Sequence, residues 1–300
     1  MGGNREGAIG RWDAVADRLG QILDRVDRVL DRSVPPAAPE PELFDRHIAF
    51  RWRRIGTGGA FEPVEHPHLP DLGDLVGIDF AVEDLVRNTE QFVAGFSANN
   101  VLLWGERGTG KSTCVKGVLR RFADRGLRLV EVQRDDLLTL PAIIGTLRTV
   151  PRRFILFCDD LSFGEGEGAY RELKVLLEGG IEARPENILF YATSNRRHLM
   201  PERMEENLGG EIHPEEAVSE KLSLADRFGL NLSFYPFNQE TYLAIVERYA
   251  ATFSLPVERE QLRREALQWA LCKGNRSGRA ARQFIDDLAG RLRVRLTDGR

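Results

Sequence analysis

The chain has 300 residues, of which 42% are hydrophobic and 29% charged, the composition of an ordinary globular protein with one large or two smaller domains. Its formal net charge of −4 does not suggest a general nucleic-acid binder, although a local basic patch stays open. Because there is no apolar run of membrane-spanning length, no apolar signal segment and no C-x-x-C pair, we expect a cytoplasmic protein with reduced thiols and no membrane contact.

The first 43 residues are expected to form an N-terminal extension. Apolar residues recur at alternating spacings of three and four from Trp12 to Val29, which predicts one amphipathic helix over 8–33. This helix docks either on its own chain or on another copy or partner. Four prolines between residues 34 and 42 then form a stiff spacer. The basic and aromatic segment from His47 to Arg54 is either a contact surface or a solvated face.

The chain is organised around the stretch from Val101 to Thr113. Residues 105–112 read GERGTGKS, which fits the P-loop pattern G-x-x-x-x-G-K-[ST]. An apolar run precedes the motif and apolar residues at helical spacing follow it; a glycine-rich turn that matches by chance is the alternative. In a P-loop, Lys111 reaches the β- and γ-phosphates and Ser112 offers its hydroxyl to Mg²⁺. The expected nucleotide-binding residues are Gly105, Glu106, Arg107, Gly108, Thr109, Gly110, Lys111, Ser112 and Thr113.

Two later apolar strands end in polar residues. The strand 154–158 is followed by Asp159, which could hold Mg²⁺, and by Asp160, which could polarise the attacking water; solvated acids at a strand end are the alternative. The strand 187–195 ends in Asn195, whose amide could orient water near the γ-phosphate. Strands alternating with helices predict an α/β fold with a parallel sheet, whose ligand groups gather at the carboxyl ends of the strands.

The last part of the chain reads as helices. Residues 240–293 show three helical stripes, so we expect an α/β nucleotide-binding domain over 44–236 and a helical lid over 237–300. The acidic, glycine-containing segment 203–216 is either a partner-contacting insertion or a plain exposed loop.

Four phrases in this order, LLWGERGTGKST, FILFCDDLSF, ATSNRRHL and EKLSLADRFGL, resemble an AAA+ ATPase. They resemble more closely a bacterial AAA+ family catalogued only as a domain of unknown function, over about residues 45–295. The resemblance implies Walker A at 105–112, Walker B at 154–160, sensor 1 at Asn195, an arginine finger for a neighbouring subunit at Arg227 and a sensor 2 arginine at Arg279. It implies that Val76 and Gly77 touch adenine, and that copies form ATP-dependent rings or spirals, often hexameric.

Each arginine also has a plainer interpretation. Arg227 could be a cation at a helix C-terminus. Arg279 could be a surface residue of the lid, with Arg276 and Arg282 as close rivals. Asp160 departs from the family pattern, which usually has Glu there; its side chain reaches about 1.5 Å less far. Hydrolysis is therefore expected to be slow or to need a partner.

Two functions stay open on this evidence. The first is a Mg²⁺-dependent ATPase that hydrolyses ATP to ADP and phosphate at subunit interfaces and remodels or loads a macromolecular client, a protein rather than a nucleic acid. The second is an ATP-dependent assembly switch or binding module with little hydrolysis. A small-molecule kinase is disfavoured because Arg227 and Arg279 would have no role, and no N-K-x-D motif supports GTP.

Overall fold

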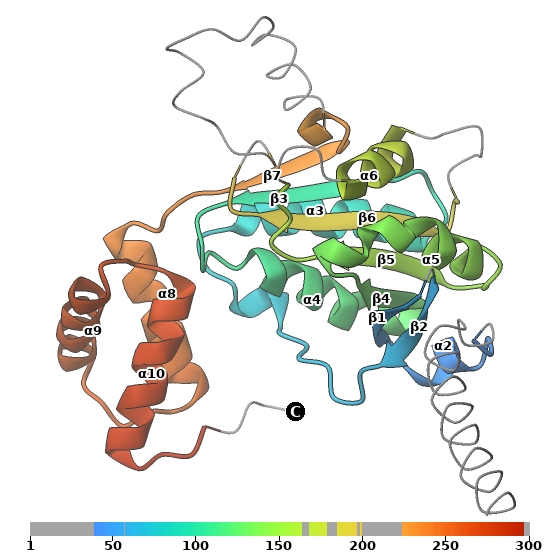
Figure 1. The fold of residues 1–300 in the computed structure, drawn as a ribbon. Helices are drawn as coiled ribbons and strands as arrows, with labels where there is room; N and C mark the ends of the chain where they lie inside the picture. Colours follow the sequence, from blue (N-terminus) through green and yellow to red (C-terminus); the bar gives the residue numbers. More distant parts are fainter. Residues whose placement is uncertain are drawn as a thin grey trace, which may run out of the picture.

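The computed structural model describes residues 39–56, 58–163, 168–178, 185–196, 199 and 224–296. The helix expected over 8–33 and the acidic segment 203–216 lie outside these residues. In the described part, a seven-stranded sheet has the order β2-β1-β4-β5-β6-β3-β7 (Figure 1). The strands are β1 (Ala49–Ile55), β2 (Gly58–Pro63), β3 (Val101–Gly105), β4 (Leu127–Glu131), β5 (Arg153–Cys158), β6 (Ile188–Ser194) and β7 (Leu230–Phe234).

Helices cover both faces of this sheet. One face packs on α3 (Asp79–Val93) and α4 (Lys111–Phe122), and the other packs on α5 (Leu140–Leu147) and α6 (Gly168–Glu178). Since all strand pairs except β1–β2 are parallel and the central strands are covered on both sides, β5 and β6 are almost continuously apolar. Shorter helical turns are α2 (Leu43–Arg46), η1 (Leu72–Asp74), η2 (Ala123–Arg125) and η3 (Arg134–Thr139). The predicted α/β class is confirmed.

The basic and aromatic segment near residue 50 is a strand, which neither interpretation of the sequence anticipated. In β1, Phe50 and Trp52 are buried, whereas Arg51 and Arg53 are exposed. The indole Nε1 of Trp52 donates a hydrogen bond of 2.8 Å to the Thr139 hydroxyl. Side chains alternate between the faces of a strand, so the aromatic residues belong to the core while the arginines face solvent.

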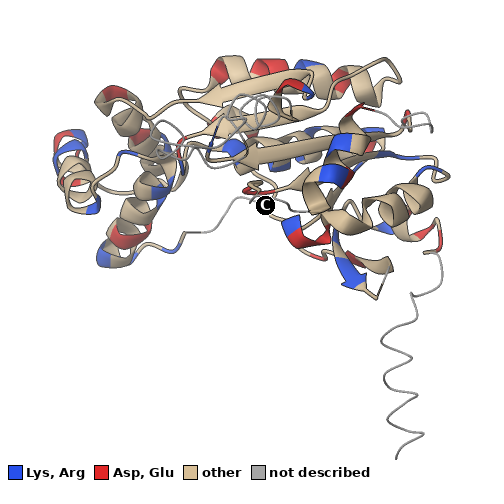
Figure 2. Ribbon diagram, turned by 45° about the horizontal axis from the view of Figure 1, so that its top comes forward, with Lys and Arg blue, Asp and Glu red and all other residues tan. Residues whose placement is uncertain are grey.

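A separate bundle of three helices follows β7: α8 (Gln239–Thr252), α9 (Arg259–Lys273) and α10 (Gly278–Leu292). Figure 1 shows the bundle in orange and red beside the sheet, and Figure 2 shows basic and acidic residues spread over its helices. The bundle has its own apolar core, which includes Tyr242, Val246, Ala266, Phe284 and Ile285. A helical lid is therefore present, while the domain boundary at 236/237 stays a prediction. Among the described residues, no helix is long and apolar enough to span a membrane.

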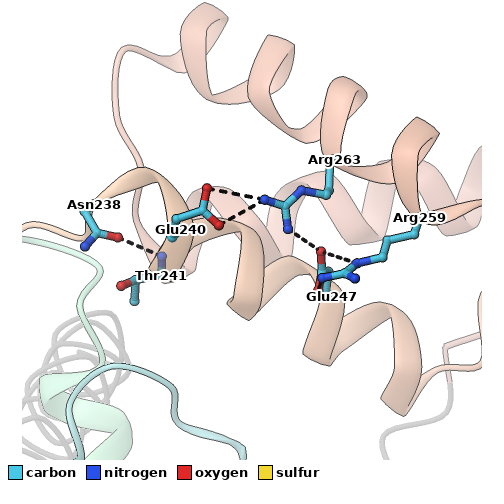
Figure 3. Close-up of polar contacts among 6 residues, drawn as sticks. All are labelled: Asn238, Glu240, Thr241, Glu247, Arg259 and Arg263. Atoms are coloured by element: carbon cyan, nitrogen blue, oxygen red, sulfur yellow. Dashed lines mark hydrogen bonds and ion pairs between the residues drawn. The ribbon is translucent and has the colours of Figure 1, made fainter.

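Ion pairs join α8 to α9 across the lid (Figure 3). Arg263 bridges two carboxylates of α8, at 3.0 Å from Glu240 and 2.7 Å from Glu247. Arg259 makes a second contact of 3.0 Å with Glu247. The hydrogen bond from Arg259, together with that from Arg263, lowers the pKa of the Glu247 carboxyl below its usual 4.5 although burial opposes this. The negative charge of Glu247 therefore contributes to the contact between α8 and α9.

Replacing Glu247 with glutamine is expected to lower the melting temperature at pH 7 by about 2–4 °C. A carboxyl whose pKa is lowered on folding contributes stability above its unfolded pKa, and that contribution disappears as pH falls through the lower folded value. The difference between Glu247→Gln and wild type should therefore vanish in acid. Melting curves from pH 3 to 8 measure this, with Glu65→Gln at an exposed loop position as the control. A difference that does not shrink as pH falls would contradict the electrostatic origin.

Candidate functional site

The loop between β3 and α4 has a backbone that only glycine adopts readily. Gly105, Gly108 and Gly110 have φ angles of 133°, 73° and 99°. A Cβ atom on Gly105 would overlap the carbonyl oxygen of Phe234 in the neighbouring strand β7. Because these positive φ angles disfavour side chains, the glycines allow the chain to turn sharply from the strand into the N-terminus of α4. That helix end carries partial positive charge and free N–H groups.

Lys111 begins α4 and is only 7% exposed. Its ammonium donates hydrogen bonds to the carbonyl oxygens of Gly105 at 2.9 Å and Glu106 at 2.7 Å, and to Asn195 Oδ1 at 3.4 Å. Burial lowers the pKa of the ammonium, while the nearby carboxylate of Asp159 opposes the shift. The loop thus holds the Lys111 ammonium through neutral carbonyl oxygens. The oxygens of a bound phosphate can take the place of these carbonyl contacts.

Two carboxylates face this lysine from the end of β5. Ser112 donates a 2.6 Å hydrogen bond to Asp159 Oδ1, which also accepts one from Thr193. The Thr193 hydroxyl accepts a bond of 2.9 Å from the backbone N–H of Asp160. The Asn195 amide donates to Asp160 Oδ1 at 2.5 Å. The P-loop, the end of β5 and the end of β6 therefore form one hydrogen-bonded cluster.

The strand order brings this cluster together. Strand β6 lies between β3 and β5 in parallel register, so the carboxyl ends of all three strands meet at one edge. Asp160 takes a left-handed conformation with φ of 54°, which Asp tolerates better than most residues. This turn places the carboxylate within hydrogen-bonding distance of Asn195.

A cleft of about 720 Å³ opens above the cluster, a size typical of small-molecule sites. Its polar lining includes residues 107–113 of the P-loop and the carboxylates described above. Its apolar lining includes Val76, Ile78, Ile245 and Tyr249, so the core and the lid both contribute. Gly77 does not line the cleft; it has a φ of 80°, and a Cβ there would overlap the methyl group of Thr241.

The start of α10 touches the P-loop directly. The backbone N–H of Gly278 donates a 2.8 Å hydrogen bond to the Gly108 carbonyl, and Arg279 lines the cleft next to it. Its rival Arg276 lines a neighbouring cavity of about 910 Å³, which Arg279 also lines, but Arg276 does not line the cleft. Arg282 also lines the cleft, where it lies over an aromatic ring of α8. Arg279 is thus the lid arginine adjacent to the P-loop.

Arg227 lies elsewhere. It stands three residues before β7 and does not line the cleft. Its guanidinium forms an ion pair of 2.5 Å with Glu178 at the end of α6. Strands β7 and β3 are parallel, with Leu230 opposite Val101 and the later residues opposite the approach to the P-loop. Arg227 therefore sits at the amino end of β7, whereas the P-loop lies at the other end.

Comparison with known proteins identifies the family. Residues 45–292 match the family described as "Protein of unknown function (DUF815)". The chain belongs to this family. Among curated proteins, none matches the DUF815 chain significantly.

Several solved structures resemble the DUF815 fold loosely. One is the Holliday junction branch migration motor RuvB of Thermotoga maritima, with a TM-score of 0.44, 14% identity and coverage of 72% of this chain and 71% of that one. A mutant of the same RuvB gives a TM-score of 0.48 and 18% identity, covering 77% of this chain and 70% of that one. A likeness of this degree says nothing about activity.

Thr193 is a site residue that the sequence analysis missed. It is 2% exposed and joins the side chain of Asp159 to the backbone of Asp160. A signal was present, because Thr193 stands two residues before Asn195 in an extended segment and so shares its side of the chain. Recognising it required knowing that β6 lies beside β5, which no local pattern shows.

Proposed function

We propose that this protein is an AAA+ type ATPase that binds ATP and Mg²⁺ in the cleft and hydrolyses ATP to ADP and phosphate at interfaces between copies. The observation that carries this proposal is the cluster in which Lys111, Ser112, Asp159, Asp160 and Asn195 meet. The work of hydrolysis is to remodel or load a macromolecular client, a protein rather than a nucleic acid.

The residues of the cluster fit a magnesium ion. Ser112 and Asp159 present a hydroxyl and a carboxylate 2.6 Å apart, and hard oxygen ligands are those that Mg²⁺ prefers. Across the described residues, no group of three or more His, Cys, Asp or Glu side chains forms a metal site. This suits an ion that takes one or two protein oxygens and completes its shell with phosphate and water. When bound, the ion neutralises charge on the phosphates.

The other residues have distinct tasks in this proposal. The loop N–H groups and Lys111 bind the β- and γ-phosphates. Asp160 accepts a proton from, or orients, the attacking water. Asn195 contacts both Lys111 and Asp160, so it keeps the phosphate-binding cation and the carboxylate in a fixed relation. Val76, which belongs to the apolar lining of the cleft, contacts the adenine ring.

The position of Arg227 supports sites shared between copies. A strand of the length of β7 spans about 17 Å, and Arg227 lies before its amino end while the P-loop lies beyond the carboxyl end of β3. A side chain cannot reach across that distance to its own phosphate site. Arg227 is therefore proposed to complete the site of a neighbouring copy in a ring or spiral, and Arg279 to contact the nucleotide of its own chain.

Replacing Asp160 with asparagine tests the proposed hydrolysis. The variant should bind ATP with unchanged affinity but turn it over about 10²-fold more slowly, because the amide cannot accept the proton of water. Phosphate release and fluorescent-nucleotide binding are measured side by side, with and without EDTA. Wild-type protein that binds ATP tightly but releases no phosphate would favour the alternative function, an ATP-dependent assembly switch. Unchanged turnover in Asp160→Asn would mean that Asp160 neither orients the attacking water nor accepts its proton.

A further inference from the structure

The ion pair between Arg227 and Glu178 joins the segment before β7 to the end of α6. Glu178 is the last residue of α6, and Arg227 follows the short helical turn before β7. Both the Nε and Nη2 atoms of Arg227 lie 2.5 Å from Glu178 Oε1. In Figure 1 the end of α6 and the segment before β7 are on the same side of the sheet. The contact therefore fixes where the guanidinium stands relative to the core.

The burial of the pair is uneven. The Arg227 side chain is 21% exposed and that of Glu178 is 41% exposed. An arginine side chain has many rotamers, and fixing them costs conformational entropy. A charge-assisted contact to two nitrogens of the planar guanidinium restricts both its position and its plane. The contact thus gives the Arg227 guanidinium a defined position within its own chain.

The geometry points to Glu178 as a positioning residue that holds Arg227 ready for the phosphate site of a neighbouring copy. This inference rests on the proposed function, in which Arg227 acts between copies. Glu178 does not line the cleft of its own chain, and its carboxylate carries the same charge as the phosphates of a neighbouring copy, so it is not itself a nucleotide ligand. Its effect passes entirely through the guanidinium, and a misplacement of about 1 Å in such a group can reduce turnover about 10²-fold.

Mixed assemblies test the inference, because they separate the copy that binds ATP from the copy that supplies the arginine. Lys111→Ala removes phosphate binding but keeps Arg227, whereas Arg227→Ala keeps phosphate binding but lacks the arginine. Mixing the two variants should restore hydrolysis that neither shows alone. Adding Glu178→Ala to the Lys111→Ala copy should reduce the restored activity about 10²-fold. Adding it to the Arg227→Ala copy should leave the restored activity unchanged.

Two further variants separate positioning from general damage to the fold. Glu178→Gln keeps an oxygen that accepts hydrogen bonds from the guanidinium, so in the Lys111→Ala copy it should preserve much of the restored activity. Glu172→Ala, on the same helix, should have no effect in either copy. Melting temperatures of all variants are measured in parallel. Where a Glu178 variant remains folded, its loss of activity is attributed to the displaced Arg227 side chain.

The possible outcomes distinguish a failure of the positioning role of Glu178 from a failure of the site shared between copies. If mixing restores activity but Glu178→Ala is silent in both copies, or raises activity, the positioning role is overturned and the shared site stands. If Glu178→Ala is equally harmful in either copy, its role is structural. If mixing restores nothing while wild type hydrolyses ATP, the shared site fails and the inference fails with it.

Discussion

Replacing Lys111 with alanine should abolish the stabilisation that ATP gives to the protein, without weakening the nucleotide-free fold. Wild-type protein with ATP at 100-fold its Kd should gain about 2.7 kcal/mol, a rise in melting temperature of about 5–11 °C. The variant should show almost none of this rise, because the cation that meets the β- and γ-phosphates is gone. Phosphate release should fall with it.

The nucleotide-free variant is expected to melt at the same temperature as wild type or higher. Burial lowers the pKa of the Lys111 ammonium, which means that folding disfavours its charged form. This penalty is present wherever the lysine is charged in both states, and it fades as pH rises through the lowered pKa. Removing the ammonium removes the penalty together with its two carbonyl contacts.

Thermal melts with and without Mg-ATP measure both effects, with Lys174→Ala on α6 as the control for removing a lysine. An ATP-dependent rise that survives Lys111→Ala would mean that the nucleotide binds outside this loop. A large fall in the melting temperature of the nucleotide-free variant would mean that Lys111 supports the fold and that its loss of binding is indirect.

The elements nearest the P-loop could be predicted because their signals are local. The motif at 105–112, the apolar run before it and the helical spacing after it all lie within about twenty residues, and the structure has β3, the loop and α4 there. Asp159 and Asp160 follow an apolar strand directly, and parallel strands end at a common edge. Their convergence with Ser112 therefore followed from local pattern and general topology.

The rest of the site depends on contacts between distant segments. The order of the strands places β6 between β3 and β5, and only this order makes Asn195 a bridge between Lys111 and Asp160. The hydrogen bond from Gly278 to Gly108 joins two backbone groups, so no pattern of side chains in the sequence predicts it.

The hairpin of β1 and β2 was missed for a different reason. Its alternation of aromatic and basic residues was visible in the sequence, but the positive charge of the segment was given more weight than its period of two. Paired with β4, β1 extends the parallel sheet and buries Phe50 and Trp52. The contact surface considered for this segment is therefore restricted to the exposed arginines on the other face of the strand.

The position of Arg227 leads to the prediction that bears on assembly. Specific activity of the wild-type protein should rise with protein concentration, because each site is completed by a neighbouring copy. Arg227→Ala should lower turnover about 10³–10⁵-fold, the range over which an arginine stabilises charge on a transferring phosphoryl group. ATP binding, followed by the ATP-dependent rise in melting temperature, should be unaffected because Arg227 does not line the cleft of its own chain.

Two controls make this result specific to the position of the charge. Arg264→Ala removes an exposed arginine from the lid and should leave turnover unchanged. Arg227→Lys keeps a positive charge but not the planar fork of donors, so it should recover only part of the loss. The pair with Glu178 is partly exposed, and such pairs contribute little to stability, so Arg227→Ala should remain folded. Activity that is independent of protein concentration and survives Arg227→Ala would mean that each copy contains a complete site, which would remove the physical reason for a ring.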